Sequence, residues 1–174
     1  MFATIDLPNF YLQAAMRHQR ELRAKPVALI EEQDKKPVII QLNEPAEKAG
    51  IRKGMTPSQA LARSLEVVIK VRTRRQEKSI QEMLLHFAFT LSPFVEATAP
   101  GVCTIQFTDN RDLTAKVSRI IEHSAECEIS AQAGIAPTPD ASVLAAHLAR
   151  PVLEIDDAKE FLARLPIETL AMSV

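Results

Sequence analysis

The sequence predicts an α+β protein: a ferredoxin-like sandwich of order βαββαβ, with a small α/β insertion after the first strand. Three observations predict this class. The chain begins with a short apolar segment, Phe2–Asp6, which is typical of a buried strand. A long segment ending at Leu91 follows the insertion, and its apolar residues recur at helical spacing. Two short strands then meet at the turn Ala99-Pro100-Gly101.

The elements of the sandwich follow one another along the chain. After the strand at Phe2–Asp6 we expect a helix from Thr73 to Leu91 with a core stripe at Ile80, Met83, Leu84, Phe87 and Leu91, a hairpin over Phe94–Phe107, a helix over Leu113–His123 and a strand over Cys127–Ala133. In this topology the first strand lies beside the second strand of the hairpin. Asp6, at the end of the first strand, is therefore expected near the turn at Pro100-Gly101.

The insertion and the C-terminal segment have elements of their own. The insertion pattern predicts a helix over 9–22, a hairpin of Val27–Ile30 and Val38–Leu42 with a charged turn over Asp34–Lys36, short helices over Pro45–Ala49 and Pro57–Arg63, and a strand over Leu65–Val71. The spacing Thr56-x-x-Gln59 predicts a capping box for the second short helix. A helix over Thr138–Ala149, a strand over Pro151–Ile155 and a terminal helix complete the chain.

The composition is that of an ordinary globular protein, with 174 residues of which 47% are hydrophobic and 25% charged. Cys103 and Cys127 lie in no Cys-x-x-Cys motif and far from the histidines, so no zinc or redox motif is present and we expect two reduced core thiols. The N-terminal segment has no basic start before a long apolar run, which excludes a secretory signal and a membrane span. A cytoplasmic protein with no membrane contact is expected.

The net charge of −1 hides an asymmetry between the two halves of the chain. Residues 1–80 hold 15 Lys and Arg against 9 Asp and Glu, whereas residues 81–174 hold 6 against 13. A basic half could supply a local surface that faces phosphate groups. The candidate DNA-binding residues are Arg52, Lys53, Arg72, Arg74, Arg75 and Lys78. The alternative is a solvated basic face, but cations at a helix N-terminus oppose the macrodipole, which favours a functional reason for them.

Three segments in this order carry a resemblance to a known family: TIDLPNFYLQA at the start, EKAGIRKGMTPSQA in the insertion and AGIAPTPDASVLAA late in the chain. Together they resemble the palm and fingers of Y-family (UmuC/DinB-like) translesion DNA polymerases, over nearly all of the chain. The Pro-Asn-Phe after Asp6, the Ala-Pro-Gly turn and the Gly-Ile-Ala-Pro-Thr-Pro segment are more narrowly similar to the ImuB type, a polymerase-like subunit of a bacterial DNA-damage mutasome.

The resemblance implies a division into domains. It predicts a palm formed by residues 1–7 and 73–135, a fingers-like insertion over 8–72, and a segment over 136–174 that completes palm and fingers. The thumb and little-finger domains of the family are expected to be absent, and the natural protein to be longer.

The resemblance also predicts where the metal ligands of an active polymerase would stand. Asp6 matches the first catalytic carboxylate, but the Asp-Glu pair of the hairpin falls on Gly101 and Val102, so this site is expected to be vestigial. A lone carboxylate cannot hold two Mg²⁺ ions. We therefore expect no metal, no cofactor and no enzyme activity, with Asp6 capping the following helix instead. If Asp6 and Glu96 formed a metal site, Mg²⁺ would be implied.

The predicted nucleotide pocket is altered as well. Glu44 and Glu47 stand where the family has a Tyr and an Arg that hold the triphosphate, and two acids would repel it. The Lys of the later Gly-Ile-Ser-Lys segment is replaced by Pro137. Tyr11 matches the aromatic residue that screens the ribose in the family. The sequence Gln81–Phe87 is faintly similar to a sliding-clamp ligand, but its apolar residues have core spacing, which favours helix packing.

The leading prediction from the resemblance is a non-catalytic, ImuB-like scaffold or adaptor in error-prone DNA damage tolerance, within the SOS response. Its implied partners are a RecA-like mutasome subunit, an error-prone replicative-type polymerase and the sliding clamp, reached through a missing C-terminal region, with weak DNA binding. Two alternatives stay open: an active nucleotidyltransferase that uses Asp6 and Glu96, and a ferredoxin-like regulatory domain that binds small molecules.

Overall fold

The computed structural model describes residues 1–31 and 36–166 and divides the chain into two compact units. The first, here the large unit, joins Met1–Pro8 to the chain from Gln81 onward, and the second, the small unit, is Asn9–Ile80. The small unit therefore extends to Ile80, past the expected fingers boundary at residue 72. The reason is that the first two turns of the long helix are in contact with the small unit through side chains such as Ser79, which accepts a hydrogen bond from Arg17.

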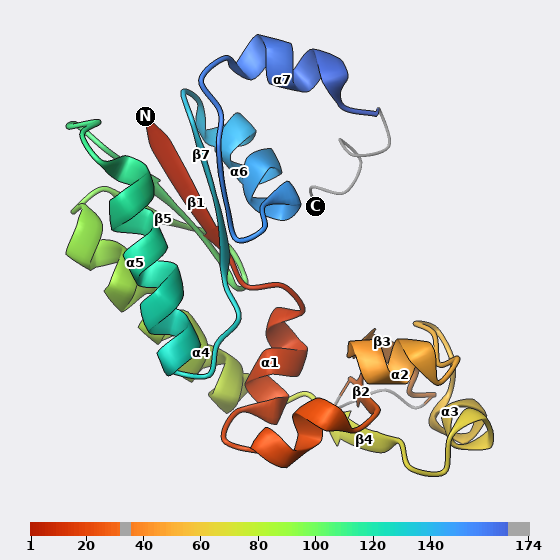
Figure 1. Cartoon of the computed structure of the whole chain (residues 1–174). Helices are drawn as coiled ribbons and strands as arrows, with labels where there is room; N and C mark the ends of the chain where they lie inside the picture. The colour runs from red at the N-terminus through yellow and green to blue at the C-terminus, as the bar shows by residue number, and fades with distance from the viewer. Residues whose placement is uncertain (32–35, 167–174) are drawn as a thin grey trace. The chain divides into compact units, whose positions relative to one another are not determined.

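The large unit contains a five-stranded sheet (Figure 1). Its strands are β1 Phe2–Asp6, β5 Val95–Ala99, β6 Val102–Gln106, β7 Gln132–Ala136 and β8 Val152–Glu154, in the order β5-β6-β1-β7-β8. β1 is antiparallel to both β6 and β7, and β8 is parallel to β7. The first four strands have the order of a ferredoxin-like sheet, so the predicted fold class is confirmed.

Helices lie on both faces of this sheet. They are α4 Arg74–Leu91, α5 Leu113–Glu126 and α6 Pro139–Leu148; a further helix, α7 Ala158–Arg164, has no buried residue. Figure 1 shows α5 and the second half of α4 on one side of the sheet and α6 on the other. Side chains with no exposed surface, such as Ile5, Ile105 and Val117, fill the space between the layers. The residues of β1 from Ala3 to Asp6 are all buried, because helices cover this strand on both faces of the sheet.

The strand expected at Cys127–Ala133 begins five residues later, at Gln132, and the predicted start was wrong because α5 ends in a specific capping motif. Glu128 adopts a left-handed backbone with φ of 65°, its N–H donates to the carbonyl of Ala125, and the N–H of Ile129 donates to Ser124. This pair of bonds is a Schellman motif. The buried Ile129 is therefore the apolar contact of a helix end, although in the sequence it is part of a strand-like pattern.

The small unit has a three-stranded sheet of order β3-β2-β4. Its elements are α1 Phe10–Met16, the 3₁₀ helix η1 Arg20–Ala24, β2 Val27–Ile30, β3 Ile39–Leu42, α2 Glu44–Lys48, α3 Pro57–Arg63 and β4 Val68–Val71. β2 pairs antiparallel with β3 and parallel with β4. The predicted capping box is confirmed, since Thr56 and Gln59 exchange both hydrogen bonds. Asp34 and Lys35 of the predicted turn lie outside the described residues.

The helix expected over residues 9–22 is broken in two. α1 ends at Met16 because His18 takes a left-handed conformation with φ of 64°, which a continuing helix cannot accommodate. The chain then forms η1, which buries Leu22 in an apolar cluster with Leu12 and Leu29. Burial of Leu22 on the sheet, rather than helical periodicity, decides the path of this segment.

No helix among residues 1–31 and 36–166 is long and apolar enough to cross a membrane.

The two cysteines are expected to differ sharply in reactivity. Cys103 has no exposed surface and its burial raises the pKa of its thiol to about 12, whereas Cys127 is half-buried at the C-terminal end of α5. Because the thiolate is the reactive form, a disulfide reagent should label one thiol of the native protein within minutes and both in guanidinium. Cys127→Ser should abolish the native labelling. Native labelling of this variant would contradict the burial of Cys103.

Candidate functional site

The candidate site lies where β1 ends beside the β5–β6 hairpin. Asp6 stands opposite Val102, and the N–H of Leu7 donates to the carbonyl of Gly101 over 2.9 Å. This confirms the expected proximity of Asp6 and the turn. Pro100 and Gly101 form the turn, and Gly101 has φ of 78°, a backbone conformation that strains any residue with a Cβ. The turn thus has a structural reason to carry glycine where the resemblance places an acid.

A side chain of α4 also holds the turn in place. Gln81, on α4, accepts a hydrogen bond of 2.7 Å from the N–H of Gly101, while its own amide nitrogen is buried and has no hydrogen-bond partner among the described residues. In the sequence, Gln81 is notable only as the first residue of the clamp-like segment Gln81–Phe87 of the long helix. No signal in the sequence connected it with the turn, because the two positions are twenty residues apart and belong to different elements.

Asp6 is only 8% exposed, and burial raises the pKa of its carboxyl group, although nearby His147 and a hydrogen bond from Gln132 act in the opposite direction. The amide nitrogen of Gln132 donates to Asp6 over 3.0 Å, and Arg150 donates to the amide oxygen of Gln132 over 3.1 Å. The expectation that Asp6 caps the following helix was wrong, since its carboxylate accepts from Gln132 and the N-cap residue Asn9 makes no side-chain cap bond.

The residues around Asp6 do not fit a pair of divalent metal ions. Two such ions lie about 4 Å apart and require several converging oxygen ligands. The neighbours of Asp6 across the sheet are Val102 and Gln132, and only the second carries a side-chain oxygen. Within residues 1–31 and 36–166, no three His, Cys, Asp or Glu side chains gather in a way that could hold a metal ion.

Glu96 does not complete the set. It stands opposite Thr104 on β5, two residues along the sheet and two strands away from Asp6. Ordinary sheet spacing puts the Cα atoms of Glu96 and Asp6 about 12 Å apart. The alternative in which these two carboxylates share a metal site therefore has no support in the geometry.

Tyr11, in the small unit, has one face of its ring covered by Arg72. The guanidinium carbon of Arg72 lies 3.8 Å from the ring centroid, which is a cation–π contact. Two nitrogens of Arg72 donate to the Glu77 carboxylate over 2.6 and 3.0 Å, and a third bond reaches Glu31 over 3.1 Å. These bonds raise the pKa of Arg72 above its ordinary value, and the hydrogen bonds to Glu77 contribute most. Each of the three guanidinium nitrogens of Arg72, predicted as a DNA contact, thus donates a hydrogen bond within the small unit.

Glu44 and Glu47 are exposed on α2. A hydrogen bond and an ion pair with Lys48, over 2.6 Å, lower the pKa of the Glu44 carboxyl. α2 is held in place by Asn43, whose side chain accepts bonds from the N–H groups of Ala46 and Val27. Two carboxylates are thus presented to solvent from a fixed helix.

Most of the predicted basic residues are exposed. Arg52 donates to the carbonyls of Glu47 and Ile51, over 2.7 and 2.8 Å, and thereby closes the end of α2. Lys53, Arg74, Arg75 and Lys78 are exposed as well. The last three belong to the first turns of α4, within the small unit. This unit carries 15 Lys and Arg against 8 Asp and Glu, so its surface is strongly basic.

Comparison with known proteins places this geometry in a family. Residues 5–147 match the impB/mucB/samB family. DNA polymerase IV of Pectobacterium atrosepticum is 25% identical over 175 residues, and that of Photorhabdus laumondii 28% over 178 residues, in each case across 95% of this chain and 50% of the relative. The chain thus spans about half the length of these curated relatives.

Solved structures agree on the fold. A post-insertion binary complex of Dbh DNA polymerase superposes with a TM-score of 0.84 at 17% identity, and DinB from Sulfolobus solfataricus with 0.80 at 15%. Each comparison covers 97% of this chain and 52% of the other. At these identities the likeness concerns the fold, which is that of a Y-family polymerase palm and fingers.

The expectation that the chain is not an enzyme was wrong. It rested on Gly101 and Val102, but the relatives that match 95% of this chain are named DNA polymerase IV, and the structures that match it are those of DNA polymerases. The narrower ImuB-type resemblance is not among these findings. With a family match that covers most of its length and a fold shared with Y-family polymerases, the chain belongs to the impB/mucB/samB family.

Proposed function

We propose that this chain is the palm and fingers part of a Y-family polymerase-like protein that binds DNA and works in DNA damage tolerance. The observation that carries the proposal is the match of 97% of the chain to binary and ternary complexes of Dbh DNA polymerase, combined with a small unit rich in exposed Arg and Lys. The relatives named DNA polymerase IV support DNA-templated nucleotidyl transfer as the proposed reaction class of the whole protein.

The basic residues of the small unit are the proposed DNA contacts, because phosphate neutralisation by Arg and Lys supplies most of the sequence-independent affinity for DNA. They are Arg52, Lys53, Arg74, Arg75 and Lys78. Arg72 supports the fold instead, through Glu77 and Glu31. Tyr11 is the proposed wall of a nucleotide pocket, and the acids at Glu44 and Glu47 would weaken its hold on a triphosphate.

The finer part of the proposal is an adaptor role. A polymerase that used this palm for two-metal chemistry would need carboxylates from outside positions 101 and 102. A multiprotein assembly would explain how a member of a polymerase family can function with a palm that lacks the hairpin carboxylates. In it the chain holds DNA and joins a RecA-like subunit, an error-prone replicative-type polymerase and the sliding clamp.

The test of DNA binding is fluorescence anisotropy with a labelled primer-template duplex. The triple variant Arg74→Ala/Arg75→Ala/Lys78→Ala should bind at least about tenfold more weakly, and the slope of log K against log salt should fall by about 0.9 for each lost phosphate contact. Circular dichroism would confirm the fold of the variant.

The matched control removes three basic residues from the acidic large unit: Arg111→Ala/Lys116→Ala/Arg119→Ala. Its affinity for the duplex should stay within about twofold of the wild type, since these residues lie outside the proposed surface. Equal losses in the two triple variants, or no binding by the wild type at about 50 mM salt, would overturn the proposed DNA surface.

A further inference from the structure

Part of the large sheet is left open on the side where α6 packs. α6 lies against β7 and β1, as Figure 1 shows, so that side of β5 and β6 is not covered by it to the same extent. The residues there are large and accessible: Phe94 is 56% exposed, and Glu96 and Gln106 are exposed too. An exposed aromatic ring beside a carboxylate on an open sheet face is a feature of binding surfaces.

These side chains share one face of the sheet. The N–H of Gln106 donates to the carbonyl of Phe94 over 2.9 Å, which places the two residues opposite each other, and Gln106 stands opposite Phe2. Glu96 stands opposite Thr104 in the next pair on the same face. Since side chains two residues apart point to the same side of a strand, all five project together.

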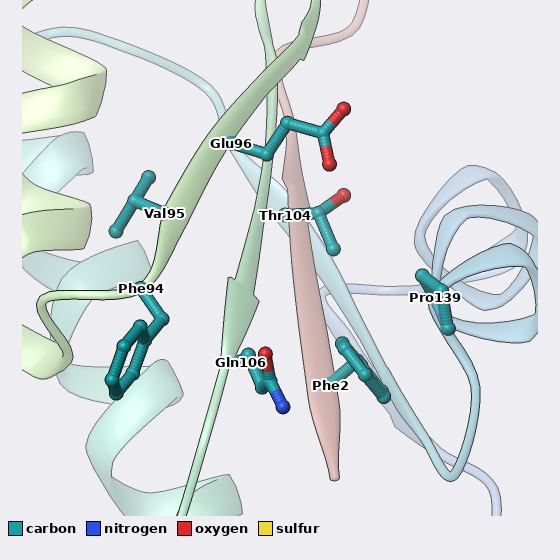
Figure 2. Close-up of a pocket in the computed structure, with 7 residues that line it drawn as sticks. All are labelled: Phe2, Phe94, Val95, Glu96, Thr104, Gln106 and Pro139. Carbon is teal, nitrogen blue, oxygen red and sulfur yellow. The ribbon is translucent and has the colours of Figure 1, made fainter.

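They form a pocket of about 280 Å³, which Pro139 at the start of α6 closes on one side (Figure 2). Figure 2 shows Glu96 at one end and Phe94, Gln106 and Phe2 toward the other. Thr104, between them, is fixed by hydrogen bonds of 3.1 Å to Thr4 and 2.8 Å to Thr98. The lining contains two aromatic rings and a carboxylate but no basic side chain.

The pocket adjoins the free edge of the sheet, because β5 is the last strand in the sheet order. Phe94 and Gln106 are a hydrogen-bonded pair, so Val95, the next residue, directs its N–H and C=O away from β6. An extended peptide could pair with these groups. The register shift between Glu96 and Ala99 shortens the available edge, which limits the pairing to a few residues.

The net charge of the large unit indicates which kind of ligand the pocket would bind. This unit holds 6 Lys and Arg against 14 Asp and Glu, so it attracts cations and repels phosphates. A cationic side chain in the pocket would meet the Glu96 carboxylate at one end and aromatic faces at the other, as in a cation–π site. A purely apolar occupant would desolvate Glu96 without compensation.

We propose that this pocket and the adjoining edge of β5 bind an extended peptide of a partner protein, with an arginine or lysine side chain of that peptide in the pocket. Backbone pairing at Val95 supplies orientation, and the pocket supplies the preference for a cation. This surface is independent of the DNA-binding residues, which belong to the small unit.

The test uses a blocked, fluorescein-labelled peptide of sequence Val-Arg-Val-Arg-Val and its acidic counterpart Val-Glu-Val-Glu-Val. The basic peptide should bind and perturb the amide resonances of Val95 and Glu96, and the acidic peptide should not. Glu96→Gln and Phe94→Ser, both at exposed positions, should each weaken binding by about fivefold or more. Glu122→Gln, an exposed acid on α5, should leave the affinity unchanged.

Three results would overturn the proposal: no binding of the basic peptide, an equal loss in Glu122→Gln, or competition of a single-stranded oligonucleotide for the same resonances. The last result would identify the pocket as part of a nucleic-acid surface. Because the DNA titration depends on Arg74, Arg75 and Lys78, either proposal can fail without affecting the other.

Discussion

Gly134→Ala is expected to destabilise the large unit severely. A Cβ at Gly134 would lie 2.2 Å from the backbone nitrogen of Ala146, 2.3 Å from the carbonyl oxygen of Ser142 and 2.6 Å from the carbonyl carbon of Ala145. All three atoms belong to the backbone of α6, so no side-chain rotation can relieve the overlap. The helix would have to move away from β7, at a cost of at least about 3 kcal/mol in the free energy of unfolding. Urea unfolding followed by circular dichroism measures the loss.

Gly50→Ala is the matched control for this prediction. It makes the same change at a residue with φ of 83°, but the added Cβ would meet nothing within 4 Å. Its cost comes from backbone strain alone and should be about 1 kcal/mol. If Gly134→Ala were no more destabilising than Gly50→Ala, the close packing of α6 on β7 would be contradicted.

The parts of the fold that the sequence predicts are those with a local signal. β1, the β5–β6 hairpin and the capping box at Thr56 lie where the pattern places them, because turn residues and apolar periodicity act over a few positions. The errors occur where a helix ends. The left-handed residues His18 and Glu128 have no Gly or Asn signature, and in both cases a buried neighbour decides the path of the chain.

In the candidate site, too, some features follow from the sequence and others do not. The proximity of Asp6 to Gly101 follows from topology, and topology follows from the element order. The partners of Asp6 do not: Gln132 is 126 residues away in the sequence, and no periodicity connects it to Asp6. The role of Arg72 was missed for a related reason, since its bonds to Glu77 and Glu31 depend on how β4 enters α4. Pairing between side chains of separate elements is a tertiary property.

The same cluster around Arg72 leads to the second large effect. Arg72→Met is expected to lower the free energy of unfolding by about 3 kcal/mol, because the Glu77 side chain is only 11% exposed and would lose its two hydrogen bonds. The substitution also removes the cation from the face of Tyr11. Thermal and urea unfolding of the isolated chain measure the loss.

A double-mutant cycle separates the ion pair from simple packing. Arg72→Met/Glu77→Met replaces both charges with apolar side chains and should recover stability to within about 1 kcal/mol of the wild type, which is about 2 kcal/mol above Arg72→Met alone; Glu77→Met, measured separately, completes the cycle. Lys48→Met, which breaks the exposed pair with Glu44, should leave stability unchanged. A double variant as unstable as Arg72→Met alone would mean that the guanidinium acts through its contact with Tyr11, and that Glu77 tolerates the loss of its partner.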